Sequence, residues 1–291
     1  MMMKYFSLTN DPDHGLVDDY RPVLRSLADA GIFVTTAVFC TLKDDGTPLS
    51  RHCNRTETHT LDNNAYCKLM KEAKAMGHEI AFHGYSQVSD LRREFEYGLE
   101  IYDKVFGEYP SVYIEHGGHP HKHDMGMCKN ENLAMFGSDV NSRHYIKDIV
   151  SELFDLVWTH DYLMDDLLEP LPLSRIFVER DGMTFFRRWR NSKIFQVQIP
   201  DDEKNALVGY THFGYTGYSR RIALRRPLQS IIAMLHNDPY VENGRKIESW
   251  KGENVKVAVR ELSNYLIERD YCPVTLGSLY EISKRTVSIE Q

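Results

Sequence analysis

The chain has 291 residues, of which 42% are hydrophobic, and its 35 Lys and Arg against 42 Asp and Glu give a formal net charge of −7. This length suits a single α/β barrel domain spanning residues 1–291, and the acidic balance argues against a nucleic-acid partner bound through its phosphates. The five cysteines form no C-x-x-C pair, no apolar run is long enough to span a membrane, and the amino terminus lacks a secretory pattern. We therefore expect a cytoplasmic protein with reduced thiols.

Strand and helix patterns alternate through the first half, which is typical of a parallel sheet with crossover helices. The run "IFVTTAVFC" at 32–40 lacks polar alternation, as expected of a strand buried on both faces. The polar stretch from Lys43 to about Asn64 is too long for an ordinary connection and predicts a loop over one rim. The predicted strands are 4–9, 32–40, 78–84 and 111–117, and the predicted helices are 16–31, 65–77 and one that opens at Ser89.

The second half is less regular. Residues 175–190 predict a hairpin that turns at Asp181 and Gly182. The basic run "FFRRWRNSK" within and after it predicts a solvated strand face, or a wall of a sugar or anion site. No repeat or linker interrupts the chain, which favours one domain. The other predicted elements are helices at 142–155, 228–237 and 255–271 and strands at 156–161 and 206–215.

Polar side chains follow successive predicted strands at their carboxyl ends. In a parallel barrel these ends converge on one mouth, where such enzymes carry their active sites. Each histidine alone is more simply explained as a structural residue, and "NDPDHG" alone is a typical turn in which Asp13 caps the next helix. Their shared position at the carboxyl ends of strands is what favours a functional site. The residues are Asp11, Asp13, His14, His83, Gln87, Glu115, His116, His119, His160 and His212.

Four segments resemble the polysaccharide deacetylase family in order and spacing: "FSLTNDPDHG", "GIFVTTAVF", "KAMGHEIAFHGYSQ" and "DYCPVTLGSLYEIS". The resemblance implies a distorted (β/α)7 barrel. It also implies that Asp11 is the general base, that Asp13 is a metal ligand, and that His83 is the first metal-binding histidine. The implied cofactor is a divalent metal, with zinc as the first choice.

The chain departs from the family at two motifs. Gln87 stands four residues after His83, where the family has its second metal histidine, and an amide oxygen is a poorer zinc ligand than imidazole. The segment with the base-orienting arginine is not recognisable in "YIEHGGHPHKHD", where His116 or His119 is placed to supply a ligand; a surface histidine cluster is the alternative. The segment "YTHFG" approximates the late motif, so the resemblance implies His212 as general acid.

Together these residues predict a metal-dependent hydrolase that removes an acyl group from an N-acylated sugar or sugar-linked precursor. The ion would polarise the acyl carbonyl and acidify water, Asp11 would accept the proton of water, and His212 would protonate the amine. Trp158, Tyr210 and Tyr215 offer faces for a sugar ring or belong to the core. The alternatives are a carbohydrate-binding relative that lost its metal through Gln87, and a hydrolase of a non-sugar C–N bond.

Overall fold

The computed structural model describes residues 3–12, 15–44, 58–88, 90–116, 139–159, 164–165, 171–190, 205–213 and 254–289. The described strands are β1 (Lys4–Asn10), β2 (Thr35–Phe39), β3 (Glu79–Gly84), β4 (Val112–Ile114), β5 (Leu156–Trp158), β6 (Met164–Asp165), β7 (Phe177–Arg180), β8 (Met183–Phe186), β9 (Arg188–Arg190), β10 (Ala206–Thr211) and β11 (Tyr271–Pro273). The described helices are α1 (Val17–Asp29), α3 (Asn64–Ala75), α4 (Arg92–Phe106), α5 (Lys147–Leu153), α9 (Asn254–Glu268) and α10 (Leu276–Ile289), with a 3-10 turn η1 (Leu173–Arg175).

The sheet closes on itself through one bent segment. In sheet order, β10, β1, β2, β3, β4 and β5 are neighbours and parallel. Only Arg187 separates β8 from β9; β8 pairs in parallel with β5, and β9 pairs in parallel with β10. The β8–β9 segment is therefore the seventh strand, joining the two ends of the order. This confirms the predicted distorted (β/α)7 barrel.

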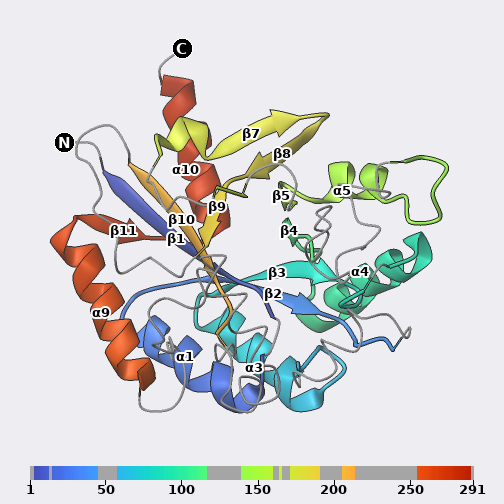
Figure 1. Cartoon of the computed structure of the whole chain (residues 1–291), viewed down its shortest axis with the longest axis horizontal. Coiled ribbons are helices and arrows are strands. Elements are labelled where there is room, and N and C mark those ends of the chain that lie inside the picture. Colours follow the sequence, from blue (N-terminus) through green and yellow to red (C-terminus); the bar gives the residue numbers. More distant parts are fainter. Residues whose placement is uncertain are drawn as a thin grey trace, which may run out of the picture.

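Helices cover the outside of the strands. Figure 1 shows α1, α3 and α9 together on one side, with α4 next to them and the β7–β8 hairpin projecting from the other side. The hairpin turns at Asp181 and Gly182, both with positive φ, as predicted. Among the described helices, none combines the length and apolar composition needed to cross a membrane.

Most predicted elements of the described part are confirmed, with shifted ends. The helix predicted to open at Ser89 begins at Arg92, because the Glu94 carboxylate accepts a hydrogen bond from the Leu91 amide and caps it there. The predicted helix 142–155 forms only over Lys147–Leu153. The predicted helix 228–237 and residues 45–57 of the polar excursion lie outside the described residues.

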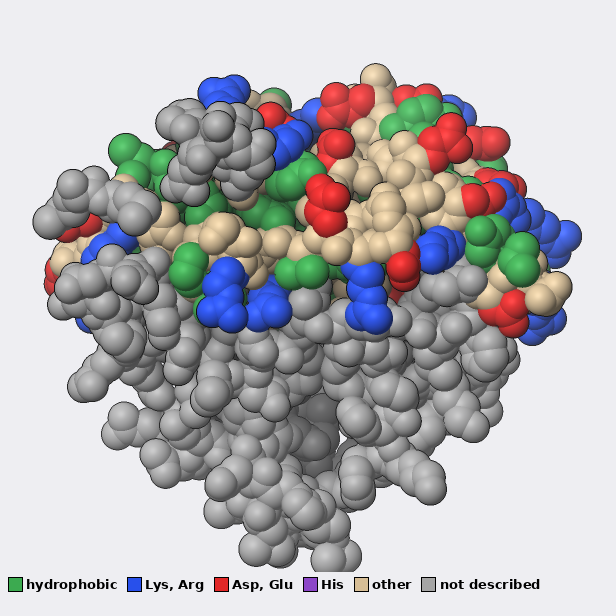
Figure 2. All heavy atoms as spheres, turned by 90° about the horizontal axis from the view of Figure 1, so that it is seen from above, with side chains coloured by type: hydrophobic (Ala, Val, Ile, Leu, Met, Phe, Trp, Pro, Cys, Tyr) green, Lys and Arg blue, Asp and Glu red, His purple; other side chains and the backbone are tan. Residues whose placement is uncertain are grey.

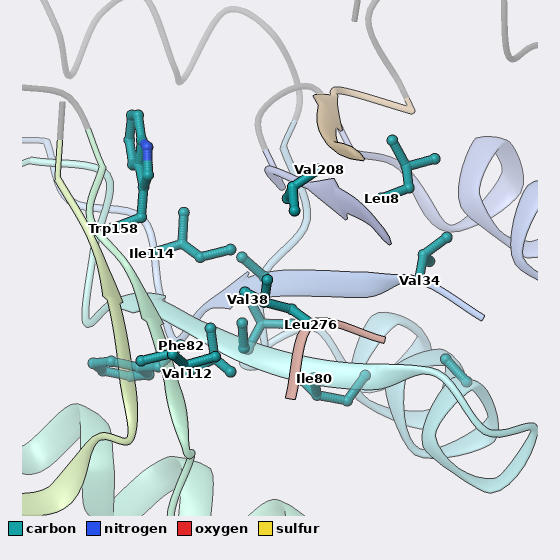
Figure 3. Close-up of a cluster of buried hydrophobic side chains, with 14 of the residues drawn as sticks. Leu8, Val34, Val38, Ile80, Phe82, Val112, Ile114, Trp158, Val208 and Leu276 are labelled. Carbon is teal, nitrogen blue, oxygen red and sulfur yellow. The ribbon is translucent and has the colours of Figure 1, made fainter. Parts of the chain in front are cut away.

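The core lies between the strands and the helices. All five residues of β2 are buried, as the lack of polar alternation predicted. Figure 3 shows side chains from several strands meeting in one cluster, including Leu8, Val38, Phe82 and Ile114. On the outer surface shown in Figure 2, Lys and Arg side chains of the described part lie in small separate groups with Asp and Glu among them.

The amino end of the barrel holds the start of α10. The Leu276 amide donates to Thr35 Oγ1 at 2.9 Å, and the Gly277 amide donates to the Glu79 carboxylate at 3.2 Å. Thr35 also donates to Glu79 at 2.6 Å. Burial raises the pKa of Glu79, although these donors favour its ionised form. The buried Thr35 and the partly buried Glu79 thus satisfy the first amides of the helix, and they lie at the end of the barrel opposite the candidate site.

Candidate functional site

The site begins where β1 and β10 end side by side. Asn10 pairs in register with Thr211, and the Asp11 amide donates to the Thr211 carbonyl at 2.9 Å. The Asn10 amide oxygen accepts from Phe213 N at 2.8 Å. These bonds place Asp11 and His212 at adjacent strand ends, as expected from their positions in a parallel sheet.

Asp11 is a buried carboxylate in a two-pronged ion pair. Its oxygens accept from the Arg188 guanidinium at 2.6 and 2.9 Å, and its side chain is 8% exposed. Burial alone would raise the pKa of Asp11, but the charge and the hydrogen bonds of Arg188 outweigh burial and lower that pKa below its ordinary value. Asp11 is therefore ionised at neutral pH.

Arg188 is a site residue that the sequence did not predict. Its side chain is 1% exposed, so the prediction of a solvated strand face is wrong at this position. Its guanidinium carbon lies 3.6 Å from the ring centre of Trp158 and 4.4 Å from that of Tyr210. The only local signal is the place of Arg188 two residues after Phe186, near the end of a strand pattern.

His83 ends β3 and is held in one tautomer. Its Nδ1 bonds the carbonyl oxygen of Ile114, and the side chain is 1% exposed. Because a carbonyl oxygen only accepts, Nδ1 carries the proton, and Nε2 of the neutral ring carries the lone pair that a metal ion requires. The ring of Phe39 packs against it at 4.7 Å between centres.

His116, just after β4, lies beside His83. The two ring centres are 5.1 Å apart, and Phe39 contacts both rings. Two imidazoles bound to one tetrahedral zinc ion, with Zn–N near 2.0–2.1 Å, would have ring centres roughly 5 Å apart. The separation of the His83 and His116 ring centres matches this value. The described residues contain no group of three or more metal-binding side chains, and the predicted ligand Asp13 lies outside them.

Gln87 is fully buried, and both ends of its amide bond the main chain of Lys43. Gln87 Oε1 accepts from Lys43 N at 2.9 Å, and Nε2 donates to Lys43 O at 2.6 Å. This pairing ties the loop after β3 to the segment after β2. That Gln87 is a metal ligand remains a prediction. In the observed structure its amide instead bonds the main chain of Lys43.

The Lys43 pairing leads to a prediction for Gln87→His. We expect the added imidazole not to tighten zinc binding, because the side chain is directed at Lys43. We expect the free energy of unfolding to fall by about 1 kcal/mol, because two partly buried main-chain groups of Lys43 lose their hydrogen-bond partner. Zinc titration and urea unfolding measure the two effects. A tighter zinc site in Gln87→His would restore Gln87 to the ligand position.

Asp90 also holds the loop after β3, and its carboxylate has a pKa in the range where the folded protein can be studied. Its carboxylate accepts from Tyr85 N at 2.8 Å and Ser86 Oγ at 2.6 Å, and lies 3.7 Å from Lys43 Nζ. Burial raises the pKa of Asp90 to about 6, against the effect of the donors and of Lys43. Glu94, which also pairs with Lys43, adds to the rise.

This raised pKa predicts a pH-dependent stability. Because the folded pKa of Asp90 lies above the ordinary value of 3.8, its contribution is complete below about pH 4 and is lost as pH rises through about 6. The wild type should lose about 3 kcal/mol of unfolding free energy relative to Asp90→Asn between about pH 4 and pH 7. Urea unfolding at several pH values measures this difference. Parallel pH curves for the two proteins would contradict it.

The remaining predicted site residues divide into two groups. Glu115 is 1% exposed, and its amide donates to Trp158 O at 3.0 Å, which joins the ends of β4 and β5. His212 is partly buried and packs edge-on against Tyr210 at 5.7 Å. The predicted residues outside the described part are Asp13, His14, His119, His160 and Tyr215.

Comparison with known proteins gives matches only among solved structures. No protein-family model and no curated protein matches the chain. The chain is similar to a peptidoglycan deacetylase from Bacillus subtilis (13% identity, 99% of this chain and 95% of that chain, TM-score 0.47). It is also similar to a family 4 acetyl xylan esterase from Clostridium thermocellum in complex with a cobalt ion (13%, 96% and 91%, 0.44) and to a polysaccharide deacetylase from Bacillus cereus (12%, 94% and 91%, 0.44). Identities of this size carry no function, because one fold hosts many reactions. The Bacillus cereus match has the name of the family that the sequence motifs resemble.

Proposed function

We propose that the protein is a metal-dependent hydrolase that removes an acyl group from an N-acylated sugar or a sugar-linked precursor. The observation that carries the proposal is the His83 imidazole, fixed with Nδ1–H on Ile114 O and with His116 beside it, in the field of the ionised Asp11. In histidine metal ligands, the ring nitrogen that does not bind the metal usually carries a proton and donates it to a carbonyl or carboxylate oxygen.

The proposed ligands are His83, His116 and Asp13. A divalent ion bound there supplies a Lewis acid for the acyl carbonyl. Asp11 accepts the proton from the attacking water, for which its charge at neutral pH is the required state. His212, at the end of the neighbouring strand, gives a proton to the departing amine. The pairing of β1 with β10, which brings Asp11 and His212 to adjacent strand ends, supports these two roles.

A panel of amides tests this proposal. Purified protein loaded with zinc or cobalt is incubated with N-acetylated monosaccharides, chito-oligosaccharides, nucleotide sugars and non-sugar N-acetyl amines, and free acetate and amine are measured. We expect release from at least one sugar substrate, abolished by chelation and restored by metal. Release only from non-sugar amides would favour the hydrolase of a non-sugar C–N bond. Sugar binding without release would favour the carbohydrate-binding alternative.

A further inference from the structure

The environment of Arg188 is unusual for a charged side chain. β9 brings it into the barrel, where it is 1% exposed and donates to both oxygens of Asp11. Its Nη1 also lies 3.3 Å from Thr9 Oγ1, on the same strand as Asp11. The Asp11 carboxylate compensates this buried charge and accepts from Nη1 and Nη2, whereas Nε has no hydrogen-bond partner among the described residues.

Two aromatic rings hold the guanidinium plane. Trp158 at the end of β5 is 3.6 Å from the guanidinium carbon, and Tyr210 near the end of β10 is 4.4 Å from it. The strand that carries Arg188 lies between these two strands in the closed barrel. One ring from β5 and one ring from β10 therefore pack on the guanidinium. Its two terminal nitrogens, which donate to the two carboxylate oxygens, fix the plane of the Asp11 carboxylate.

We propose that Arg188, whose guanidinium lies over the rings of Trp158 and Tyr210, is the positioning residue for Asp11. The inference rests on the proposed function, in which Asp11 accepts a proton from the attacking water. The sequence segment after β4 offers no arginine for this task, and Arg188 reaches Asp11 from a position 177 residues further along the chain. The two aromatic rings consequently have a task other than stacking on a sugar at the faces that Arg188 covers.

Lysine cannot replace Arg188 in this role. An ammonium is a single point of charge, whereas the guanidinium holds both oxygens in one plane and stacks on the rings. A carboxylate that is free to rotate loses alignment with the attacking water, and misplacement by about 1 Å costs roughly 10²-fold in rate. The loss should appear in kcat rather than in KM, because Arg188 is 1% exposed and its two terminal nitrogens are directed at Asp11.

The experiment uses three variants of the full chain: Arg188→Lys, Arg188→Ala and, as a matched control, Arg180→Lys on the exposed β7 strand. On a substrate found with the wild type, we expect kcat of Arg188→Lys to fall roughly 10²-fold with KM nearly unchanged. Millimolar guanidinium should restore part of kcat to Arg188→Ala, and ethylammonium should not. Arg180→Lys should match the wild type.

Crystal structures of Arg188→Lys and Arg188→Ala provide a readout that needs no substrate. We expect the Asp11 carboxylate to rotate from its position in the wild type, and to return when guanidinium is soaked into Arg188→Ala. Full kcat in Arg188→Lys, or an unmoved Asp11 in both structures, would overturn the inference. A wild type that hydrolyses nothing would overturn the proposed function instead, and the position of Asp11 would still decide the role of Arg188.

Discussion

Asp11→Asn should lower hydrolysis of an N-acylated substrate by roughly 10² to 10⁴-fold, the usual contribution of a positioned proton acceptor. The amide keeps the size of the carboxylate but cannot accept the proton of water. If "NDPDHG" acted only as a turn, the same change would preserve the backbone preference and most of the rate. Steady-state kinetics on the metal-loaded variant measure the effect.

The same substitution should also lower stability. Asp11 is the charged partner of a buried arginine, and breaking a buried pair by removing one partner costs about 3–5 kcal/mol. Rates must therefore be normalised to the folded fraction, measured by circular dichroism at the assay temperature. Asp18→Asn, an exposed aspartate at the start of α1, is the matched control and should change neither quantity. A folded Asp11→Asn protein with near-normal rate would remove Asp11 from the mechanism.

Gly277→Ala should destabilise the fold without touching the candidate site. A Cβ at this position would overlap with Oε1 of Glu79, which the Gly277 amide needs as its acceptor. Overpacking of this kind costs about 1–3 kcal/mol, and displacing Glu79 also removes the acceptor of a buried amide. Urea unfolding of the variant measures the loss.

The control for Gly277→Ala is Thr286→Ala, an exposed position further along α10. It should leave the unfolding midpoint close to that of the wild type. At low temperature, where Gly277→Ala is still folded, zinc affinity should equal that of the wild type, because Glu79 lies at the other end of the barrel. Wild-type stability in Gly277→Ala would show that α10 does not depend on its contact with Glu79.

The fold was predictable where local pattern decides structure. Residues 32–40 form a short apolar run, and the burial of β2 within it follows from the lack of polar alternation. The closure of the barrel was not readable locally, because the β8–β9 segment divides its pairing between two distant strands. The helix α10 was not predicted either, since its first amides are satisfied by Thr35 and Glu79 from far earlier in the chain.

In the candidate site, too, residues that belong to a local pattern were predictable, and residues whose role comes from a distant contact were not. Asp11 and His83 were predicted because they match family motifs and follow strands directly. Arg188 was not, because its role comes from a partner 177 residues away that no local pattern indicates. The use of Gln87 was equally hidden, since its partner is the main chain of Lys43 rather than a side chain.

Metal titration into chelator-treated protein tests the central claim most directly. Zinc and cobalt are titrated calorimetrically into the wild type, His83→Ala, His116→Ala and a control, His144→Gln, whose imidazole bonds the main chain of Asp90. We expect one ion per chain in the wild type and the control. Loss of a residue that only hydrogen-bonds a metal ligand weakens metal binding by roughly 10 to 100-fold. Loss of the His83 or the His116 imidazole should weaken metal binding by more than this. A wild type that takes up neither zinc nor cobalt, or a His83→Ala protein that binds them as the wild type does, would contradict the assignment of a metal-dependent hydrolase.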